Sequence, residues 1–230
     1  MPSSAAIRGA GQALGAPALA MGATFLAFGA AVAEAGLALG WALACTGAVY
    51  GMAGQLVLLQ VTATGGAALP ATIAATAANA RFLPMAVAIA PLLGRRRLRW
   101  LALPFIAITP WAAGMRAMPA LPDARRLPWF LGFALASWCV AMAATAAGHL
   151  AAPALPVAFR AALLFANPLY FALLLAADAG RPGVAPALIA GVLAAPLAWG
   201  IGGAWGLPAA GLLGGTLAFL LRRHWPGRPR

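Results

Sequence analysis

The segments 49-VYGMAGQ-55 and 77-AANARFLP-84 belong to one apolar stretch, residues 49–91, that decides how the chain folds. This stretch contains four conspicuous polar residues, Gln55, Gln60, Asn79 and Arg81. An arginine in hydrocarbon costs roughly 2.5–3.5 kcal/mol on insertion scales, so it usually faces a cavity or a partner. Pro84 removes a backbone donor, and asparagine is a poor helix-interior residue, so the helix is expected to be interrupted here. A polar, interrupted segment at membrane depth predicts a site for transported cargo.

The composition is that of a polytopic membrane protein. Of 230 residues, 64% are hydrophobic and only 8% are charged, whereas a soluble domain carries about 25% charged residues. We therefore expect an all-α membrane helix bundle that forms a single transmembrane transport domain over residues 1–230, with a basic tail, 222–230, that frays. The net charge of +12 comes from arginines in short loops and at the C-terminus. This placement indicates cytoplasmic membrane anchoring and argues against nucleic-acid binding.

The hydropathy pattern predicts about six to eight apolar segments. They are expected at residues 9–33, 36–62, 66–93, 100–115, 128–150, 155–177, 183–205 and 207–221. If every segment crossed once, the basic loops 95–99 and 116–126 would lie on opposite faces, against the positive-inside rule. The conflict disappears if 66–93 and 100–115 are broken or re-entrant and each returns on the cytoplasmic side. The C-terminus is then cytoplasmic as well.

Several stretches carry a family resemblance. They are 15-GAPALAMGATFLAFGAAVAEAGL-37, 50-YGMAGQLVLLQ-60, 79-NARFLPMAVAIAPLL-93 and 129-WFLGFALASW-138. Over residues 11–221 the chain resembles the AzlC-type branched-chain amino acid exporters, the large subunit of the LIV-E family. The resemblance implies secondary export of branched-chain amino acids, and in some cases methionine, across the bacterial inner membrane. It also implies a small AzlD-type membrane subunit as partner.

The chain departs from the family pattern at three places. Met52 stands where the family usually has glycine, and Phe82 follows the Asn-x-Arg motif where histidine is common. Thr109 is followed by Pro110 instead of the acidic residue frequent in the family. The last departure removes a carboxylate that could couple transport to protons, so the cargo could differ from that of closer family members.

The four polar residues suit an amino acid ligand. Arg81 could bind its carboxylate together with the N–H groups of an interrupted helix. Oxygens of Gln55 and Asn79, with Gln60 nearby, could accept from the ammonium group. Glu34 is the acid best placed by sequence for proton or ion coupling. The structural alternatives are an Arg81 that snorkels to the interface, and amides that only join helices.

Other classes of function fit poorly. With two histidines and three acids, the chain lacks the groups of most catalytic sites, so no enzyme activity is expected. Cys45, Cys139, His149 and His224 have no ligand spacing, so neither a metal site nor a cofactor is expected. The remaining alternative to a transporter is a non-transporting membrane scaffold or regulatory subunit, whose small-residue faces would bind other helices.

Overall fold

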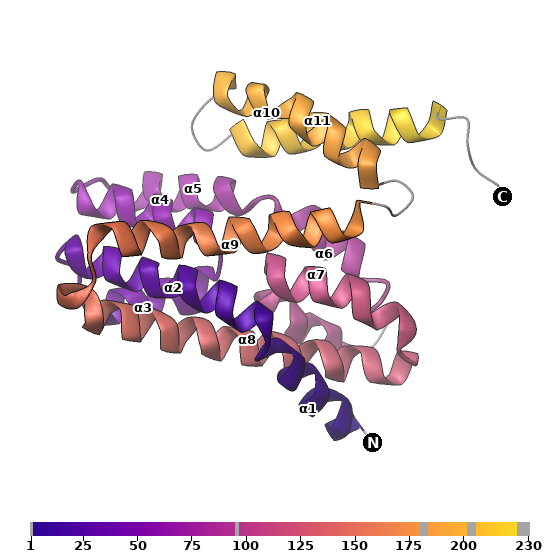
Figure 1. Cartoon of the computed structure of the whole chain (residues 1–230), viewed down its shortest axis with the longest axis horizontal. Coiled ribbons are helices and arrows are strands. Elements are labelled where there is room, and N and C mark those ends of the chain that lie inside the picture. Colours follow the sequence, from indigo (N-terminus) through magenta and orange to yellow (C-terminus); the bar gives the residue numbers. More distant parts are fainter. Residues whose placement is uncertain (1, 95–96, 180–183, 202–205, 225–230) are drawn as a thin grey trace.

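The computed structural model describes residues 2–94, 97–179, 184–201 and 206–224, and the described chain is all-α (Figure 1). The first half contains α1 (Pro2–Ala13), α2 (Ala16–Glu34), α3 (Leu39–Val49), α4 (Met52–Ala63), α5 (Ala68–Asn79), α6 (Phe82–Ile89) and the 3₁₀ helix η1 (Arg97–Phe105). The second half contains α7 (Ile108–Ala117), η2 (Met118–Ala120), α8 (Asp123–Ala151), η3 (Ala152–Ala154), α9 (Val157–Asp178), α10 (Val184–Ile201) and α11 (Gly206–His224). The expected helix bundle is confirmed.

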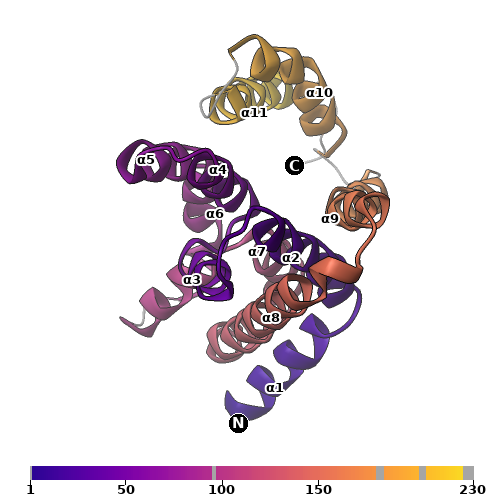
Figure 2. The same ribbon diagram turned by 90° about the vertical axis from the view of Figure 1, so that its left-hand side faces the viewer.

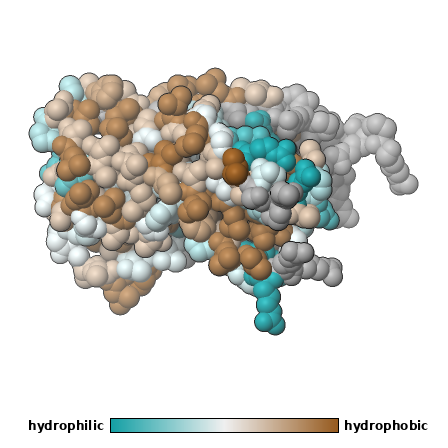
Figure 3. Space-filling view, turned by 90° about the horizontal axis from the view of Figure 1, so that it is seen from below, coloured by the Kyte–Doolittle hydropathy of each residue, from teal (hydrophilic) through white to brown (hydrophobic). Residues whose placement is uncertain are grey.

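Three helices of the described chain are long and apolar enough to cross a membrane by themselves. They are Ala16–Glu34, the continuous stretch Asp123–Ala154 and Val184–Ile201. The bent pair α5 and α6 adds a fourth crossing if it forms one span. Figure 3 shows a face dominated by hydrophobic residues, with hydrophilic residues gathered toward one end. The protein is a multi-pass membrane protein.

The first apolar segment is shorter than expected. The sequence predicts one span over 9–33, but the helix ends at Ala13 and a new one begins at Ala16. Gly15 precedes the new helix and Pro17 occupies its first turn, where the missing proline N–H costs no hydrogen bond. The expected single span is therefore broken before Ala16, and only α2 spans.

Helices α2 and α8 form the centre of the bundle (Figure 1). A Cβ atom at Gly29 would collide with the carbonyl oxygen of Thr145, and one at Gly148 would collide with that of Leu26. Small residues thus let the two backbones touch, which is how membrane helices associate without a hydrophobic driving force between them. Phe28 of α2 is fully buried and packs in a hydrophobic cluster with residues of α3 and α4.

The segment 36–62 does not span, contrary to the sequence prediction. It breaks at Tyr50, whose φ of 39° is left-handed, and α4 runs back along α3. Thr62, near the end of α4, lines one cavity together with Trp41, near the start of α3. The start of α3 and the end of α4 thus lie close together, so the two helices form a re-entrant hairpin, and its second helix lies beside α5 (Figure 2).

The segment 66–93 is broken as predicted, with a bend of 45° between α5 and α6. It does not return, however: Ile89 packs in a core cluster with Ala5 and Phe130, at the opposite end of the bundle from the start of α5. The segment 100–115 does return, because η1 leads inward and α7 leads back to Met118 in that same cluster. One re-entrant hairpin thus opens from each end of the molecule.

The basic loops lie at the same end of the bundle, as predicted, although the segments that re-enter differ from those expected. The start of η1, the turn before α8 and the N-terminus of α1 all lie at one end of the bundle (Figure 1). The arginines of loops 95–99 and 116–126 that the structure describes therefore share one face. Residues 95–96 of the first basic loop and 225–230 of the predicted basic tail lie outside the described residues.

Candidate functional site

Breaks in three segments meet in the middle of the molecule. The breaks follow Val49, Asn79 and Phe105. A Cβ atom at Gly51 would lie 2.7 Å from the side-chain oxygen of Asn79 and from the ring of Phe82. Ala107 lines the same small cavity as Gly51. The breaks therefore lie close together, and they belong to the two re-entrant hairpins and the bent α5–α6 pair.

A small cavity of about 50 Å³ contains Arg81 in its lining. Gly51 and Met52 at the start of α4, and Ala107 and Ile108 at the start of α7, line it too. The N–H groups of a first helical turn lack intrahelical acceptors and carry a positive partial charge. The lining thus combines a guanidinium with two positive helix ends, an arrangement suited to an anion.

The guanidinium of Arg81 is only partly engaged. Among the described residues, its Nε is buried and has no hydrogen-bond partner. Its carbon lies 5.4 Å from the ring centroid of Phe82, which is within cation–π range. The side chain is partly buried at an internal cavity, whereas a snorkelling residue would lie exposed at a bundle end. A buried donor without a partner is costly, so the site is poised for an acceptor.

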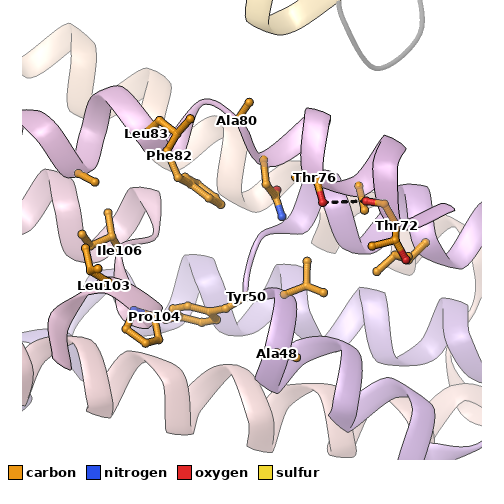
Figure 4. Close-up of a pocket in the computed structure, with 15 residues that line it drawn as sticks. Ala48, Tyr50, Thr72, Thr76, Ala80, Phe82, Leu83, Leu103, Pro104 and Ile106 are labelled. Carbon is orange, nitrogen blue, oxygen red and sulfur yellow. Dashed lines mark hydrogen bonds between the residues drawn. The ribbon is translucent and has the colours of Figure 1, made fainter. Parts of the chain in front are cut away.

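A larger cavity of about 680 Å³ adjoins the small one, since Tyr50 and Phe82 line both. Figure 4 shows the two rings projecting from their helix breaks toward the space between the helices. The remaining lining is mostly aliphatic, including Leu58, Leu83 and Ile106. The last residues of α3 and α5 also line it. Carbonyl groups at helix C-termini carry a negative partial charge, so this cavity is apolar with weakly negative edges.

The hydroxyl groups around the larger cavity are already bonded. Thr72 donates to the carbonyl of Ala68, 2.9 Å away, and Thr76 donates to that of Thr72, 2.8 Å away (Figure 4). The hydroxyl of Tyr50 donates to the sulfur of Met21, 3.7 Å away. The hydrogen of each of these hydroxyls is therefore engaged, and the wall offers a ligand mainly methyl groups and rings, with the hydroxyl oxygens as acceptors.

Asn79 links two of the breaks. Its Oδ1 accepts a hydrogen bond from the backbone N–H of Gly54 over 3.3 Å. Gly54 lies in the first turn of α4, so Asn79 acts as a helix cap supplied by another helix. A Cβ atom at Gly54 would lie 2.5 Å from Nδ2 of Asn79, so only glycine leaves room for this amide.

The other expected site residues lie elsewhere. Gln55 is fully buried and its Nε2 donates to Thr46 over 3.0 Å; Thr46 in turn contacts Thr145 of α8 over 3.0 Å. Gln60 is exposed on α4, and Glu34 is exposed at the end of α2. Thus the structure brings Arg81 and Asn79 to the cavities, while Gln55 lies behind them in a polar cluster.

The sequence reasoning missed Tyr50, Phe82 and the start of α7. A signal for the first was present, because the Tyr50-Gly51 pair lies beside the polar stretch, and glycine favours chain breaks. The start of α7 was visible only as Pro104 and Pro110 interrupting an apolar run. That these residues share a wall with Arg81 depends on tertiary contacts alone.

The fold and its cavities define a class: multi-pass helical membrane proteins whose interrupted helices enclose a polar site. The family described as AzlC protein matches residues 17–155, more than half of the chain, which therefore belongs to the AzlC family. The match runs from the first turn of α2 to the end of α8, and it therefore includes every break that lines the two cavities. No curated protein and no solved structure matches the chain.

Proposed function

We propose that this chain is the large subunit of a secondary exporter of small apolar L-amino acids, such as branched-chain amino acids and methionine. The observation that carries the proposal is the partly engaged Arg81 guanidinium in a cavity at the junction of the helix breaks. AzlC-type proteins are components of branched-chain amino acid exporters, which supports the substrate class. The whole chain would act as one transport domain.

In this proposal each part of an amino acid has a complementary surface. The carboxylate binds Arg81 and the N–H groups that begin α4 and α7. The ammonium lies toward the carbonyl ends of α3 and α5. Asn79 is the last residue of α5 and comes two residues before Arg81. The alkyl side chain occupies the larger cavity, where the hydroxyls of Thr72 and Thr76 are already bonded.

The remaining predicted residues take secondary parts. Gln55 holds α4 against α3 and α8 from behind the cavity, through Thr46 and Thr145. A substrate contact by Gln60 or ion coupling by Glu34 would require these exposed residues to approach the cavity in another conformation. The end of the bundle that carries the loop arginines is proposed to face the cytoplasm of a bacterial inner membrane. A small AzlD-type subunit is proposed as partner.

The test is efflux of radiolabelled leucine, valine and methionine from bacterial cells that lack other exporters of these compounds. Expression of the chain with its partner should accelerate efflux, and Arg81→Ala should abolish the acceleration. Arg8→Ala is the matched control, because Arg8 is exposed on α1, away from the cavities. Unchanged efflux with Arg81→Ala would refute the site. No efflux from the native pair would favour the scaffold alternative.

A further inference from the structure

The charges around the two cavities are unbalanced. Arg81 is charged, and none of the described residues that line either cavity is acidic. The whole chain has three acids. Glu34 is the last residue of α2, Asp123 begins α8 and pairs with Arg126 over 2.6 Å, and Asp178 is the last residue of α9. None of these three acids is among the residues that line the cavities, which lie where the breaks after α3, α5 and η1 meet.

A zwitterion would therefore be held very unequally. Its carboxylate would meet a full positive charge and two positive helix ends, in a cavity of about 50 Å³. Its ammonium would meet no full negative charge, only the dipoles of carbonyl, amide and hydroxyl groups. The carboxylate would face an opposite full charge and the ammonium only partial charges, so the Coulombic attraction on the carboxylate is the stronger and dominates recognition.

We infer that the site binds apolar monocarboxylates as a class, and that the ammonium group is dispensable. The ligands are then branched-chain amino acids and also the corresponding 2-oxo acids, which keep the carboxylate and the alkyl chain but lack the amine. This inference rests on the proposed function for the location of the site. It differs in predicting that an anion without an amine binds about as well as the amino acid.

The larger cavity supports the same ligand class. Its wall is aliphatic and aromatic, and the hydroxyls of Tyr50, Thr72 and Thr76 are occupied by other acceptors. A polar side chain would lose its water there and gain few partners, because the hydroxyl hydrogens are engaged and most of the wall is apolar. An aliphatic side chain has no hydrogen bonds to water to lose, and this holds whether the neighbouring carbon carries an amine or a keto oxygen.

The experiment measures binding to the purified full chain in detergent. Radiolabelled 4-methyl-2-oxopentanoate and L-leucine are titrated separately, and each is competed with leucinamide, which keeps the amine but lacks the carboxylate. We expect the 2-oxo acid to bind within about fivefold of leucine and leucinamide to bind at least about tenfold more weakly. Arg81→Gln should weaken both labelled ligands at least about tenfold, and Arg81→Lys should weaken them less.

Arg8→Gln is the matched control and should leave both affinities unchanged; the elution volume and helical circular dichroism of each variant verify its fold. If leucine binds but the 2-oxo acid does not, the inference is overturned and the proposed function survives. If only the 2-oxo acid binds, the predicted similarity of the two affinities is overturned and amino-acid export fails, and only the dispensable ammonium group remains of the inference. If neither binds, both fail. Competition by leucinamide as strong as that by the 2-oxo acid would also overturn the inference.

Discussion

The side-chain oxygen of Asn79 accepts a hydrogen bond from the backbone N–H of Gly54 over 3.3 Å. This contact joins the end of α5 to the start of α4, the second helix of a re-entrant hairpin. It lies beside Phe82, which lines both cavities. A ligand that reached Arg81 would therefore sit next to this connection.

Asn79→Ala should destabilise the protein by about 0.5–2 kcal/mol, because the Gly54 N–H loses its acceptor. Asn79→Asp should retain most of the stability, since it keeps an acceptor at a positive helix end. Thermal unfolding in detergent measures both effects. Thr76→Val is the control on the same helix, because Thr76 bonds only within α5. Equal stability of the Asn79→Ala variant and the native protein would argue against a capping role.

Gly54→Ala should impair both folding and efflux, since the new Cβ would lie 2.5 Å from Nδ2 of Asn79. Adding Asn79→Ala should restore part of the stability by removing the colliding amide, although the carbonyl oxygen of Ala75 remains 3.0 Å away. Gly40→Ala is the control, because nothing lies within 4 Å of the position that its new Cβ would occupy. Thermal stability of the single and double variants provides the readout, and strictly additive losses would contradict the proposed collision.

Gly148→Ala should separate α8 from α2 and lower the yield of folded protein, because the added methyl would collide with the carbonyl oxygen of Leu26. Overpacking of this kind typically costs about 1–3 kcal/mol. The control is Gly22→Ala on α2, whose new methyl would lie 3.6 Å from Val140, an ordinary contact. The yield of monodisperse protein after size exclusion compares them. Similar yields would show that the two helices do not pack by backbone contact.

Gln55→Leu should destabilise the protein by about 1–3 kcal/mol, because it breaks a buried polar chain through Thr46 and Thr145. Gln60→Leu on the same helix should be nearly neutral, since Gln60 is exposed. Unfolding temperatures of the two variants give the comparison. A larger loss from Gln60→Leu would reverse the assignment of the inner face of α4.

Accessibility labelling tests the re-entrant hairpin. In a background with Cys45 and Cys139 replaced by alanine, Ala35→Cys and Thr64→Cys should react from the same side of the membrane. These positions flank α3 and α4, which enter and return. Arg99→Cys and Arg125→Cys should react from the other side, proposed to be cytoplasmic. Labelling of positions 35 and 64 from opposite sides would restore the single span predicted from the sequence.

The sequence by itself determined the class of fold and the position of the helix break beside Arg81. The apolar composition required helices, because backbone groups in lipid must find their hydrogen bonds within the chain. Arg81, Asn79 and Pro84 marked the interruption between α5 and α6, and the structure confirms that break. A charged group in an apolar segment is costly enough to be visible without any knowledge of contacts.

Only the tertiary structure decided which segment returns and what surrounds Arg81. The run 36–62 is as apolar as a true span, and its reversal at Tyr50 depends on packing of α3 against α8 and of α4 against α5. Likewise, the start of α7 and the rings of Tyr50 and Phe82 meet Arg81 through contacts distant in sequence. Hydropathy measures the free energy that an apolar segment gains on leaving water. A hairpin buried among other helices gains about as much as a span, so hydropathy does not distinguish the two.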